Sequence, residues 1–519
     1  MTDLFPNCLR KHVHIVYVLL IVVSPRLSTR AAECSPAFPD AVGQGAVAVG
    51  GRGGDVYHVV TLKDYDPKKD EPVVAGSLRY AINSARGPRT IVFDIGGGIK
   101  LHGTLTISRS KLTIAGQTAP GGITLWGYPL QVDEASDIII RFVRVRTGDF
   151  NARAPKGNDS IHGNGAMDLD APDANGIGVI HSSRIILDHV STAWGMDETL
   201  SVTHSRDVTV QHSIIAEGLD RSFHPKGPHG YGSLIRGEIT PADQDNGIGG
   251  YTLYGNLWAL NRARNPSVGG EQTLKPGQSE SQRRRADVNI VDNVIYGWSE
   301  RPTHRNDFGS IRLNFVGNYF VNGPANKSPF IFFDHNPAPT ITYQDGNMLD
   351  ANLNRELDGK IVGLPADISD TFRGIDANDQ LLGPPDGKPL NFFKTVAKHV
   401  VPADKAYSRV ISSVGDSLAR DTIDRRIIEY VVSRTGYPLD SQEVYRDAHG
   451  VLPGIDDLVV TRRPTGFDSD RDGIPDEFEK QHGLNAHNSR DRNCFNLSKS
   501  GYTNLEVYLN SLIHNLPGS

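Results

Sequence analysis

The sequence has few cysteines, no basic excess and few long hydrophobic runs, and each shortage excludes a class of protein. Three cysteines in 519 residues exclude a disulfide framework. Lysine and arginine total 54 against 60 for aspartate and glutamate, so the net charge of −6 gives no sign of a nucleic-acid partner. After residue 32, no run is apolar enough to cross a membrane. The 38% of hydrophobic residues and the 54 glycines instead favour a globular chain of short strands and turns.

Residues 1–32 are predicted to be a signal peptide. Arg10 and Lys11 precede an apolar run over residues 13–23, and small residues follow that run. This order is typical of an export signal, and the run is too short to span a bilayer. The alternative is a buried strand or helix of the mature fold. We expect a secreted protein, extracellular or periplasmic, in which Cys34 and Cys494 could form a disulfide.

A short theme repeats between about residues 46 and 323. A β-branched strand is followed by a polar residue and a second short apolar strand, and the polar residues are His189, His212, Asn256, Asn293 and Asn318. Their spacings of 23, 44, 37 and 25 residues fit a period of about 22–25 residues, with one double period and one long loop. One such unit buries too little apolar surface alone, so units must stack. The sequence predicts an all-β, right-handed parallel β-helix, whose bend residues hydrogen-bond along the stack. A β-sandwich, the alternative, requires more frequent hairpin signals.

Four parts of the chain are expected. The signal peptide is followed by the β-helix over residues 33–323 and by a loop and helical region over 324–462 that packs on it. Residues 463–519 form a small acidic tail. One helix is predicted after Asp421, with Ile423, Ile427, Ile428 and Val431 on one face and Gly436 at its end.

Acidic and basic loops of the repeat are expected to meet on stacked coils, because equivalent residues of successive coils lie about 4.8 Å apart. Clustered carboxylates suit Ca²⁺, and neighbouring lysine and arginine suit an acidic ligand. Each loop has a plainer interpretation as a solvated or turn segment, and the histidines as turn residues. The candidate residues are Asp168, Asp170, Asp173, Asn175, Asp197, Glu198, His224, Lys226, His229, Arg262 and Arg264.

Several of these stretches resemble the secreted polysaccharide lyases of the pectate lyase superfamily. The similar segments are residues 141–149, 186–189, 194–202, 224–232 and 264–266, and the resemblance covers about residues 45–325. It implies cleavage of an acidic polysaccharide, polygalacturonate, by Ca²⁺-assisted β-elimination, by a protein expected to be a monomer.

The resemblance also assigns roles. Arg264 matches the catalytic base, Lys226 the substrate-binding lysine and Asp197 a Ca²⁺ ligand, and we expect His224, His229 and Arg262 to contact the substrate. The sequence departs from the family at Ser201 and Asn175, which replace two Ca²⁺ aspartates, and at Gly269, which replaces an arginine. Glu198, Asp173 or Asp170 could supply the missing carboxylates.

β-Elimination explains why such residues are needed. A base removes the C5 proton of a uronic acid, and negative charge builds up on the adjacent carboxylate, where a cation stabilises it. Arginine is an unusual base because its pKa in water exceeds about 12. We expect Arg264 to lie in a cationic cluster that disfavours its proton.

The tail contains a Ca²⁺-loop motif, D-x-[DN]-x-[DN]-G-x₅-E. The predicted ligands are Asp468, Asp470, Asp472, the carbonyl of Ile474, Asp476 and Glu479. No helix is expected before Asp468, so the segment resembles the loops of dockerins or thrombospondin type 3 repeats rather than a full EF-hand. The alternative is a plain acidic linker.

Two other functions stay open. A polygalacturonase would use paired catalytic aspartates, but the Asp456–Asp457 pair lies outside the repeat. A non-catalytic β-helix that binds polysaccharide or acts as an adhesin is the alternative from another class, and the substitutions at Ser201 and Gly269 keep it open.

Overall fold

The computed structural model describes residues 35–152, 175–224, 226–237, 249–271, 274, 276–279, 282–305, 309–325, 330–333, 339–365, 372–373 and 381–513. The predicted signal peptide, Cys34, Asp168, Asp170 and Asp173 lie outside these ranges. Within them, no helix combines the length and the hydrophobicity needed to cross a membrane.

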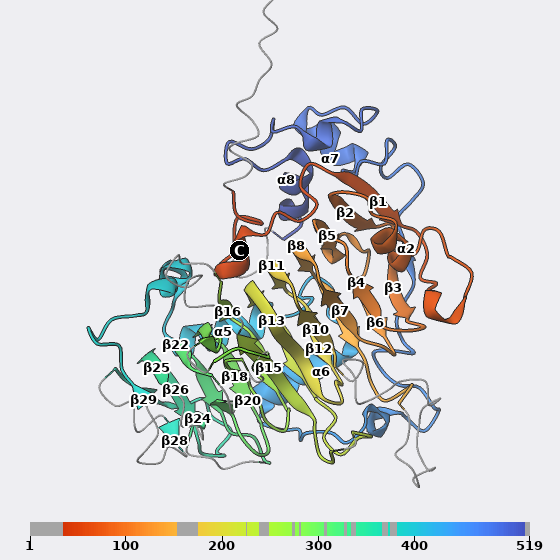
Figure 1. The fold of residues 1–519 in the computed structure, drawn as a ribbon. Helices are drawn as coiled ribbons and strands as arrows, with labels where there is room; N and C mark the ends of the chain where they lie inside the picture. Colours follow the sequence, from red (N-terminus) through yellow and green to blue (C-terminus); the bar gives the residue numbers. More distant parts are fainter. Residues whose placement is uncertain are drawn as a thin grey trace, which may run out of the picture.

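Three ladders of parallel strands run through the molecule (Figure 1), and from β2 onward the chain visits them in the same order, coil after coil. The first ladder contains β1 (Asp55–Val59), β2 (Arg89–Phe93), β5 (Leu112–Ala115), β8 (Ser136–Arg141), β11 (Ser183–Asp188), the second half of β13 (Glu198–Gln211), β16 (Tyr251–Tyr254), β19 (Ala286–Val291), β22 (Ile311–Val316), β25 (Thr340–Asp345) and β29 (Leu381–Leu382). The second contains β3 (Ile95–Lys100), β6 (Ile123–Trp126), β9 (Val143–Arg146), β12 (Ser191–Ala193), β14 (Ile214–Ala216), β17 (Leu257–Ala259), β20 (Val294–Tyr296), β23 (Tyr319–Val321) and β26 (Asn347–Asp350). The third contains β4 (Leu105–Ile107), β7 (Leu130–Asp133), β10 (Ile177–Ile180), the first half of β13, β15 (Tyr231–Gly237), β18 (Ser267–Gly269), β21 (Thr303–Arg305), β24 (Phe332–Phe333) and β28 (Phe372–Arg373).

This arrangement is a parallel β-helix, and its parallel pairing excludes the β-sandwich. Two strands pair antiparallel with the ends of the second ladder: β27 (Lys360–Gly363) with β26, and β30 (Thr461–Arg462) with β3. The strands β24, β25, β26, β28 and β29 continue the stack beyond residue 323. The expectation of a loop and helical region from residue 324 onward is therefore wrong for these strands, and Asn347 repeats the polar bend between β25 and β26.

Asparagines stack inside the bend between the first and second ladders. The side-chain carbonyl of Asn293 accepts from the backbone N–H of Asn256 at 2.8 Å, and that of Asn318 from Asn293 at 3.1 Å. Asn347 continues the series by accepting from Asn318 at 3.0 Å. All four are fully buried, so each turn amide that water cannot reach finds a partner. The prediction that the asparagines hydrogen-bond along the stack is confirmed.

The histidines, however, do not occupy the asparagine position. Ser213, not His212, lies opposite Asn256 and donates its backbone N–H to that side chain at 2.9 Å. His189 and His212 occupy the preceding position, where φ is 51° and 49°, and their rings lie 5.0 Å apart. The repeat from this coil to the next is thus 43 residues, one fewer than the sequence spacing predicted.

The outer face of the first ladder is covered along its length, which explains its continuous apolar runs. Residues before β1 cover Ile139 and Ile186, residues before α5 (Ala403–Ser413) cover Val291, and the tail covers Val92. The tail contains α7 (Asp476–His482) and α8 (Asn504–Ser511).

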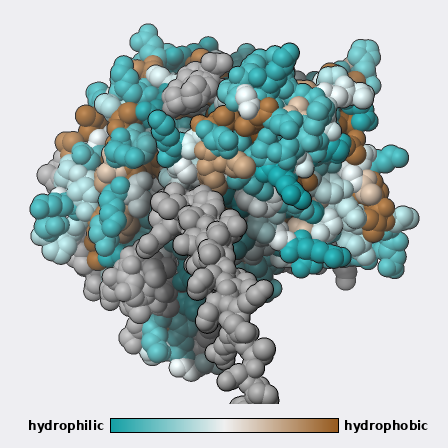
Figure 2. Space-filling model, turned by 90° about the horizontal axis from the view of Figure 1, so that it is seen from above, coloured by the Kyte–Doolittle hydropathy of each residue, from teal (hydrophilic) through white to brown (hydrophobic). Residues whose placement is uncertain are grey.

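Seen from above, the surface is mostly hydrophilic with small hydrophobic patches (Figure 2). The short helix α2 (Leu78–Asn83) packs near the first coil.

The predicted helix is present as α6 (Thr422–Ser433). Asp421 caps it by accepting from the N–H of Asp424 at 2.7 Å, and Ile423, Ile427 and Val431 are buried. The helix ends earlier than predicted, because Arg434 takes a left-handed conformation with φ of 59°. The α6 helix lies against the second ladder through a buried ion cluster of Arg144, Arg146, Asp416, Asp421 and Asp424.

Asp292 gives the stability of this fold a pH dependence. Burial raises its pKa to about 8, although Val401 donates an N–H to its carboxylate at 3.0 Å. Between about pH 4 and 8 the unfolded chain has lost this proton and the folded chain has kept it, so stability should fall as the pH rises toward 8. We expect Asp292→Asn, which mimics the protonated acid, to unfold at a higher temperature than the parent at pH 8.5, and at a similar one at pH 5.

The measurement is the melting temperature across this pH range. Asp404→Asn, at an exposed acid of α5, is the control, and its melting temperature should depend on pH in the same way as that of the parent. A melting temperature of Asp292→Asn that runs parallel to the parent at every pH would contradict the assignment.

Candidate active site

The candidate site lies where strands of the third ladder begin. Glu198 starts β13 and pairs in register with Tyr231, which starts β15. Asn175 precedes β10, and its side chain accepts from the N–H of Glu198 at 3.2 Å. On the next coil, Ser233 donates its N–H to the carbonyl of Arg264 at 2.6 Å. Stacking thus brings residues from four distant loops to one edge of the ladder.

Arg264 is held between an acid and an aromatic ring. Its guanidinium forms an ion pair with Glu198 and lies 3.9 Å from the centre of the Tyr231 ring. Its backbone is left-handed, with φ of 59°. The cationic cluster expected around this residue is not found among its described neighbours, because the nearest charge is the carboxyl of Glu198. Burial, and then the charge of Asp197, raise the pKa of Glu198 to about 8 against the opposing effect of Arg264.

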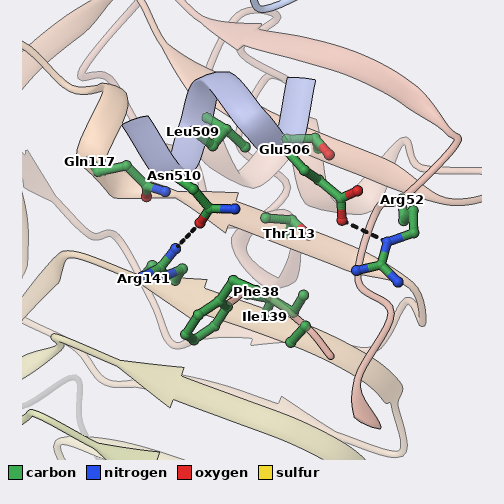
Figure 3. A pocket seen from close by; sticks show the side chains of 11 residues that line it. Phe38, Arg52, Thr113, Gln117, Ile139, Arg141, Glu506, Leu509 and Asn510 are labelled. Carbon is green, nitrogen blue, oxygen red and sulfur yellow. Dashed lines mark hydrogen bonds and ion pairs between the residues drawn. The ribbon is translucent and has the colours of Figure 1, made fainter. Parts of the chain in front are cut away.

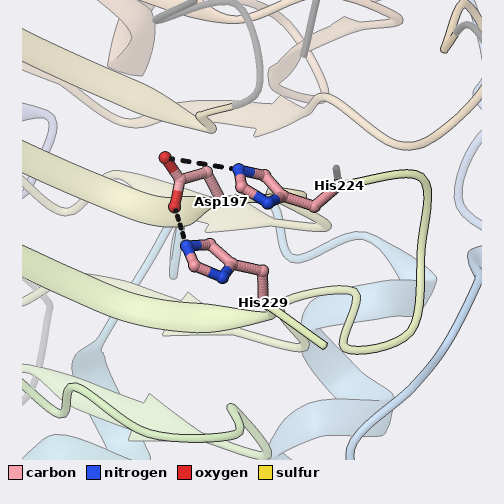
Figure 4. A group of neighbouring side chains, drawn as sticks. All are labelled: Asp197, His224 and His229. Atoms are coloured by element: carbon pink, nitrogen blue, oxygen red, sulfur yellow. Dashed lines mark ion pairs between the residues drawn. The ribbon is translucent and has the colours of Figure 1, made fainter. Parts of the chain in front are cut away.

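Asp197 lies beside two stacked histidines (Figure 4). The imidazole of His229 is 3.0 Å from one carboxylate oxygen, and that of His224 is 4.0 Å from the other. The two rings are 3.9 Å apart and almost parallel. Burial alone would raise the pKa of Asp197, but hydrogen bonding and charge from His229 lower it overall, so the carboxylate stays anionic.

Asp197 is the described residue that best fits the Ca²⁺ ion expected here. Its carboxylate is anionic, and its Oδ1 atom lies 3.0 Å from the His229 ring, which would have to share that oxygen with the ion. Glu198 is engaged by Arg264, and the Asn175 oxygen accepts from the Glu198 backbone. Since Ca²⁺ takes 6–8 oxygens, most of its ligands would have to be substrate carboxylates and water. The prediction that Asn175 and Glu198 share the ion with Asp197 therefore lacks support from their observed contacts.

Lys226 and Arg262 differ in their availability to a ligand. Lys226 is exposed, and only its backbone N–H is recorded in a contact, with His224 at 3.3 Å. Arg262 forms ion pairs with Asp220 at 3.0 Å and with Glu300 at 2.8 Å. A substrate carboxylate would have to compete with these two acids for Arg262, whereas Lys226 is open to solvent.

Sequence reasoning missed three residues around the site. Tyr231 supports Arg264, and Asp220 and Glu300 hold Arg262. Tyr231 belongs to the stretch 224–232 that carries the resemblance, so a signal existed there. Nothing in the spacing of Asp220 or Glu300 predicts their contacts, because both lie outside the repeating strands.

The tail forms a second acidic cluster. Carboxylate oxygens of Asp468, Asp470 and Asp472 lie within 4.8 Å of one another, as do those of Asp472, Glu479 and a residue outside the motif, Asp491. The predicted ligand Ile474 follows directly, and its N–H donates to Asp472 at 2.8 Å.

Asp476 is not among the carboxylates that gather in this cluster, although it was predicted to be a ligand. Its two oxygens accept from the backbone N–H of Ser469 at 2.7 Å and from the Ser469 hydroxyl at 2.6 Å. The residue opens α7, and its carboxylate closes the loop through Ser469.

The sequence is similar to known proteins over nearly its whole length. It is 33% identical to "Probable pectate lyase C" of Neosartorya fischeri over 498 residues, covering 95% of this chain and 97% of that protein. It is 34% identical to the protein of the same name from Emericella nidulans over 480 residues, covering 92% and 93%. No family model matches. Among solved structures, the cedar pollen allergen jun a 1 shares 16% identity, 72% and 92% coverage, and a TM-score of 0.46. The chain belongs to the pectate lyase family and is a polysaccharide lyase.

Proposed function

We propose that this lyase cleaves α-1,4-linked polygalacturonate by β-elimination at the site around Arg264. The observation that supports this proposal is the stacking of Arg264, Glu198 and Asp197 at one edge of the third ladder, within a chain of the pectate lyase family. We further propose that the protein is a secreted monomer and that its β-helix is right-handed, the usual hand of connections between parallel strands.

The roles of the residues follow from their positions. Arg264, in its deprotonated form, takes the C5 proton; the C4–O bond to the neighbouring sugar then breaks, the double bond forms between C4 and C5, and the departing oxygen takes a proton from water. The Tyr231 ring and the Glu198 carboxyl hold the Arg264 side chain in place. Lys226, exposed and flexible, binds a carboxylate of the substrate, and His224, His229 and Arg262 line the approach. A Ca²⁺ ion held by Asp197 would neutralise the charge that develops on the uronate carboxylate.

Glu198 also regulates the charge next to the base. Burial and the charge of Asp197 raise the pKa of this carboxyl against the opposing effect of Arg264, so Glu198 takes up a proton more readily than an exposed glutamate. The protonated form lets the guanidinium lose its proton more readily than the anion would, because an adjacent negative charge favours the charged arginine.

The tail is proposed to hold a second, structural Ca²⁺ ion, as in the dockerin or thrombospondin type 3 loops that it resembles. Asp468, Asp470, Asp472, Glu479 and the Ile474 carbonyl are the proposed ligands, and Asp476 is withdrawn from the set.

The deciding experiment adds the purified protein to polygalacturonate with Ca²⁺ and follows ultraviolet absorbance. Elimination creates a carbon–carbon double bond conjugated with the carboxylate, so we expect absorbance to rise steadily. A hydrolase would release reducing ends without this absorbance, and an adhesin would bind without cleavage. Either of these results would overturn the proposal.

A further inference from the structure

The carboxylate of Asp491 faces the tail loop from outside the motif. Asp491 lies twelve residues after Glu479, beyond α7, yet its oxygen lies within 4.8 Å of ligand oxygens of Asp472 and Glu479. Its Oδ2 accepts from the N–H of Asn485 at 3.1 Å, whereas its Oδ1 is buried and accepts no hydrogen bond. One oxygen thus anchors the side chain and the other is directed into the cluster.

Several oxygens of this cluster are buried and accept no hydrogen bond. Glu479 and Asp472 are fully buried, and both oxygens of Glu479, both of Asp470 and one of Asp472 accept no hydrogen bond. Among the described residues, no lysine or arginine forms an ion pair with any of these three acids or with Asp491. Burying carboxylates without partners is costly unless a proton or a cation neutralises them, and several of them gathered in one place favour a cation. A donor set of oxygens alone suits Ca²⁺.

The proposed ion would lie against the first coil of the β-helix. His58 of β1 places one ring nitrogen 3.4 Å from Asp468 and the other 2.9 Å from Asp94. Ile474, at the end of the loop, is fully buried and packs in one cluster with Val92 of β2 and Ala115 of β5. The shape of the loop therefore sets how the tail contacts the first ladder.

The helix α8 also joins the tail to the β-helix, because Leu505, Tyr508 and Leu509 pack in the same buried cluster as Val92. A pocket lies between α8 and the first ladder, and the side chains of Leu509 and Ile139 line it (Figure 3). Two polar contacts cross it, from Arg52 to Glu506 at 2.7 Å and from Arg141 to Asn510 at 3.0 Å. The loop and α8 thus both attach the tail to the first ladder.

We propose that Asp491 is a ligand of the tail Ca²⁺ ion and that the bound ion clamps the tail onto the first coils of the β-helix. This inference rests on the proposed tail site and extends it by one ligand and by a mechanical role. The ion draws together the loop, α7 and the segment that precedes α8, so its loss should free all three from β1, β2 and β5.

Two isosteric variants distinguish the proposed role of Asp491 from the role of a residue within the loop motif. We expect Asp491→Asn to weaken Ca²⁺ binding by the tail about tenfold or more, because ligand charge sets affinity in such loops. Asp476→Asn, which changes a motif residue directed toward Ser469, should bind within about threefold of the parent. The measurement is calorimetric titration of the full chain with Ca²⁺ after chelation, with Asp197→Asn in every protein to remove the ion of the active site.

The outcomes are distinct. A parent chain that binds no Ca²⁺ in this background would overturn both the tail site and the inference. A parent that binds while Asp491→Asn binds equally well, or while Asp476→Asn loses as much, would overturn only the role of Asp491.

The clamp is tested by hydrogen exchange of the full chain with and without Ca²⁺. Chelation should speed exchange at least about tenfold over 468–511 and at β1, and leave central strands such as β16 unchanged. Asp491→Asn should show the same pattern at a Ca²⁺ concentration that saturates the parent, and its lyase turnover should stay near that of the parent. Unchanged protection of the tail on chelation would overturn the clamp.

Discussion

Arg264→Lys should abolish β-elimination while leaving the protein folded. Removing a well-placed base typically costs about 10²–10⁴-fold in rate. A lysine ammonium can still pair with Glu198, but it cannot lie flat on the Tyr231 ring or reproduce the planar fork of the guanidinium. Substrate affinity should fall much less, because Lys226 remains. The measurement is turnover per folded molecule, from product absorbance, with circular dichroism as the check on folding.

The alternative role for Arg264 is purely structural, as the partner that neutralises buried Glu198. In that case Arg264→Lys should lose thermal stability and keep its turnover. Glu198→Gln is the variant to compare with it, because it removes the carboxyl group and keeps the shape of the side chain. A folded Arg264→Lys variant that turns over within about threefold of the parent would remove this residue from the mechanism.

Arg146→Met should destabilise the whole protein by about 3–5 kcal/mol, the usual cost of leaving buried charges without their partner. The Arg146 side chain is fully buried, and its guanidinium lies 3.0 Å from Asp421 and 2.8 Å from Asp424 of the α6 region. Burial opposes the charged form of Arg146, but these two acids raise its pKa overall, so the guanidinium stays charged. Methionine keeps the apolar stem and removes the charge.

The measurement is the denaturant midpoint, with Arg184→Met as the matched control. Arg184 also pairs with an acid, Asp137 at 2.7 Å, but its side chain is 38% exposed. Exposed pairs contribute about 0–1 kcal/mol, so the control should lose little. Equal losses in the two variants would show that burial of the α6 cluster is not the source of the effect.

The sequence predicted the part of this fold that repeats. Each coil of the β-helix uses a β-branched strand and a polar bend, so the period and the hydrogen-bonding asparagines could be inferred from spacing alone. The N-terminal cap and the buried face of α6 could likewise be predicted, because the sequence signals of a helix are local. Spacing could not distinguish His212 from Ser213 as the residue aligned with Asn256. The two residues are adjacent, and the left-handed backbone conformation of His212 is visible only in the structure.

By itself, the sequence determined the coil, the loops that carry chemistry and the acidic motif of the tail, because these depend on residues near one another in the chain. Only the tertiary structure decided which side chains meet. It paired Arg264 with Glu198 from a coil 66 residues earlier, set two histidines against Asp197, turned Asp476 toward Ser469 and brought Asp491 to the cluster in its place. The physical reason is that contacts between coils depend on loop lengths and register, and a shift of one residue changes which side chain faces the site.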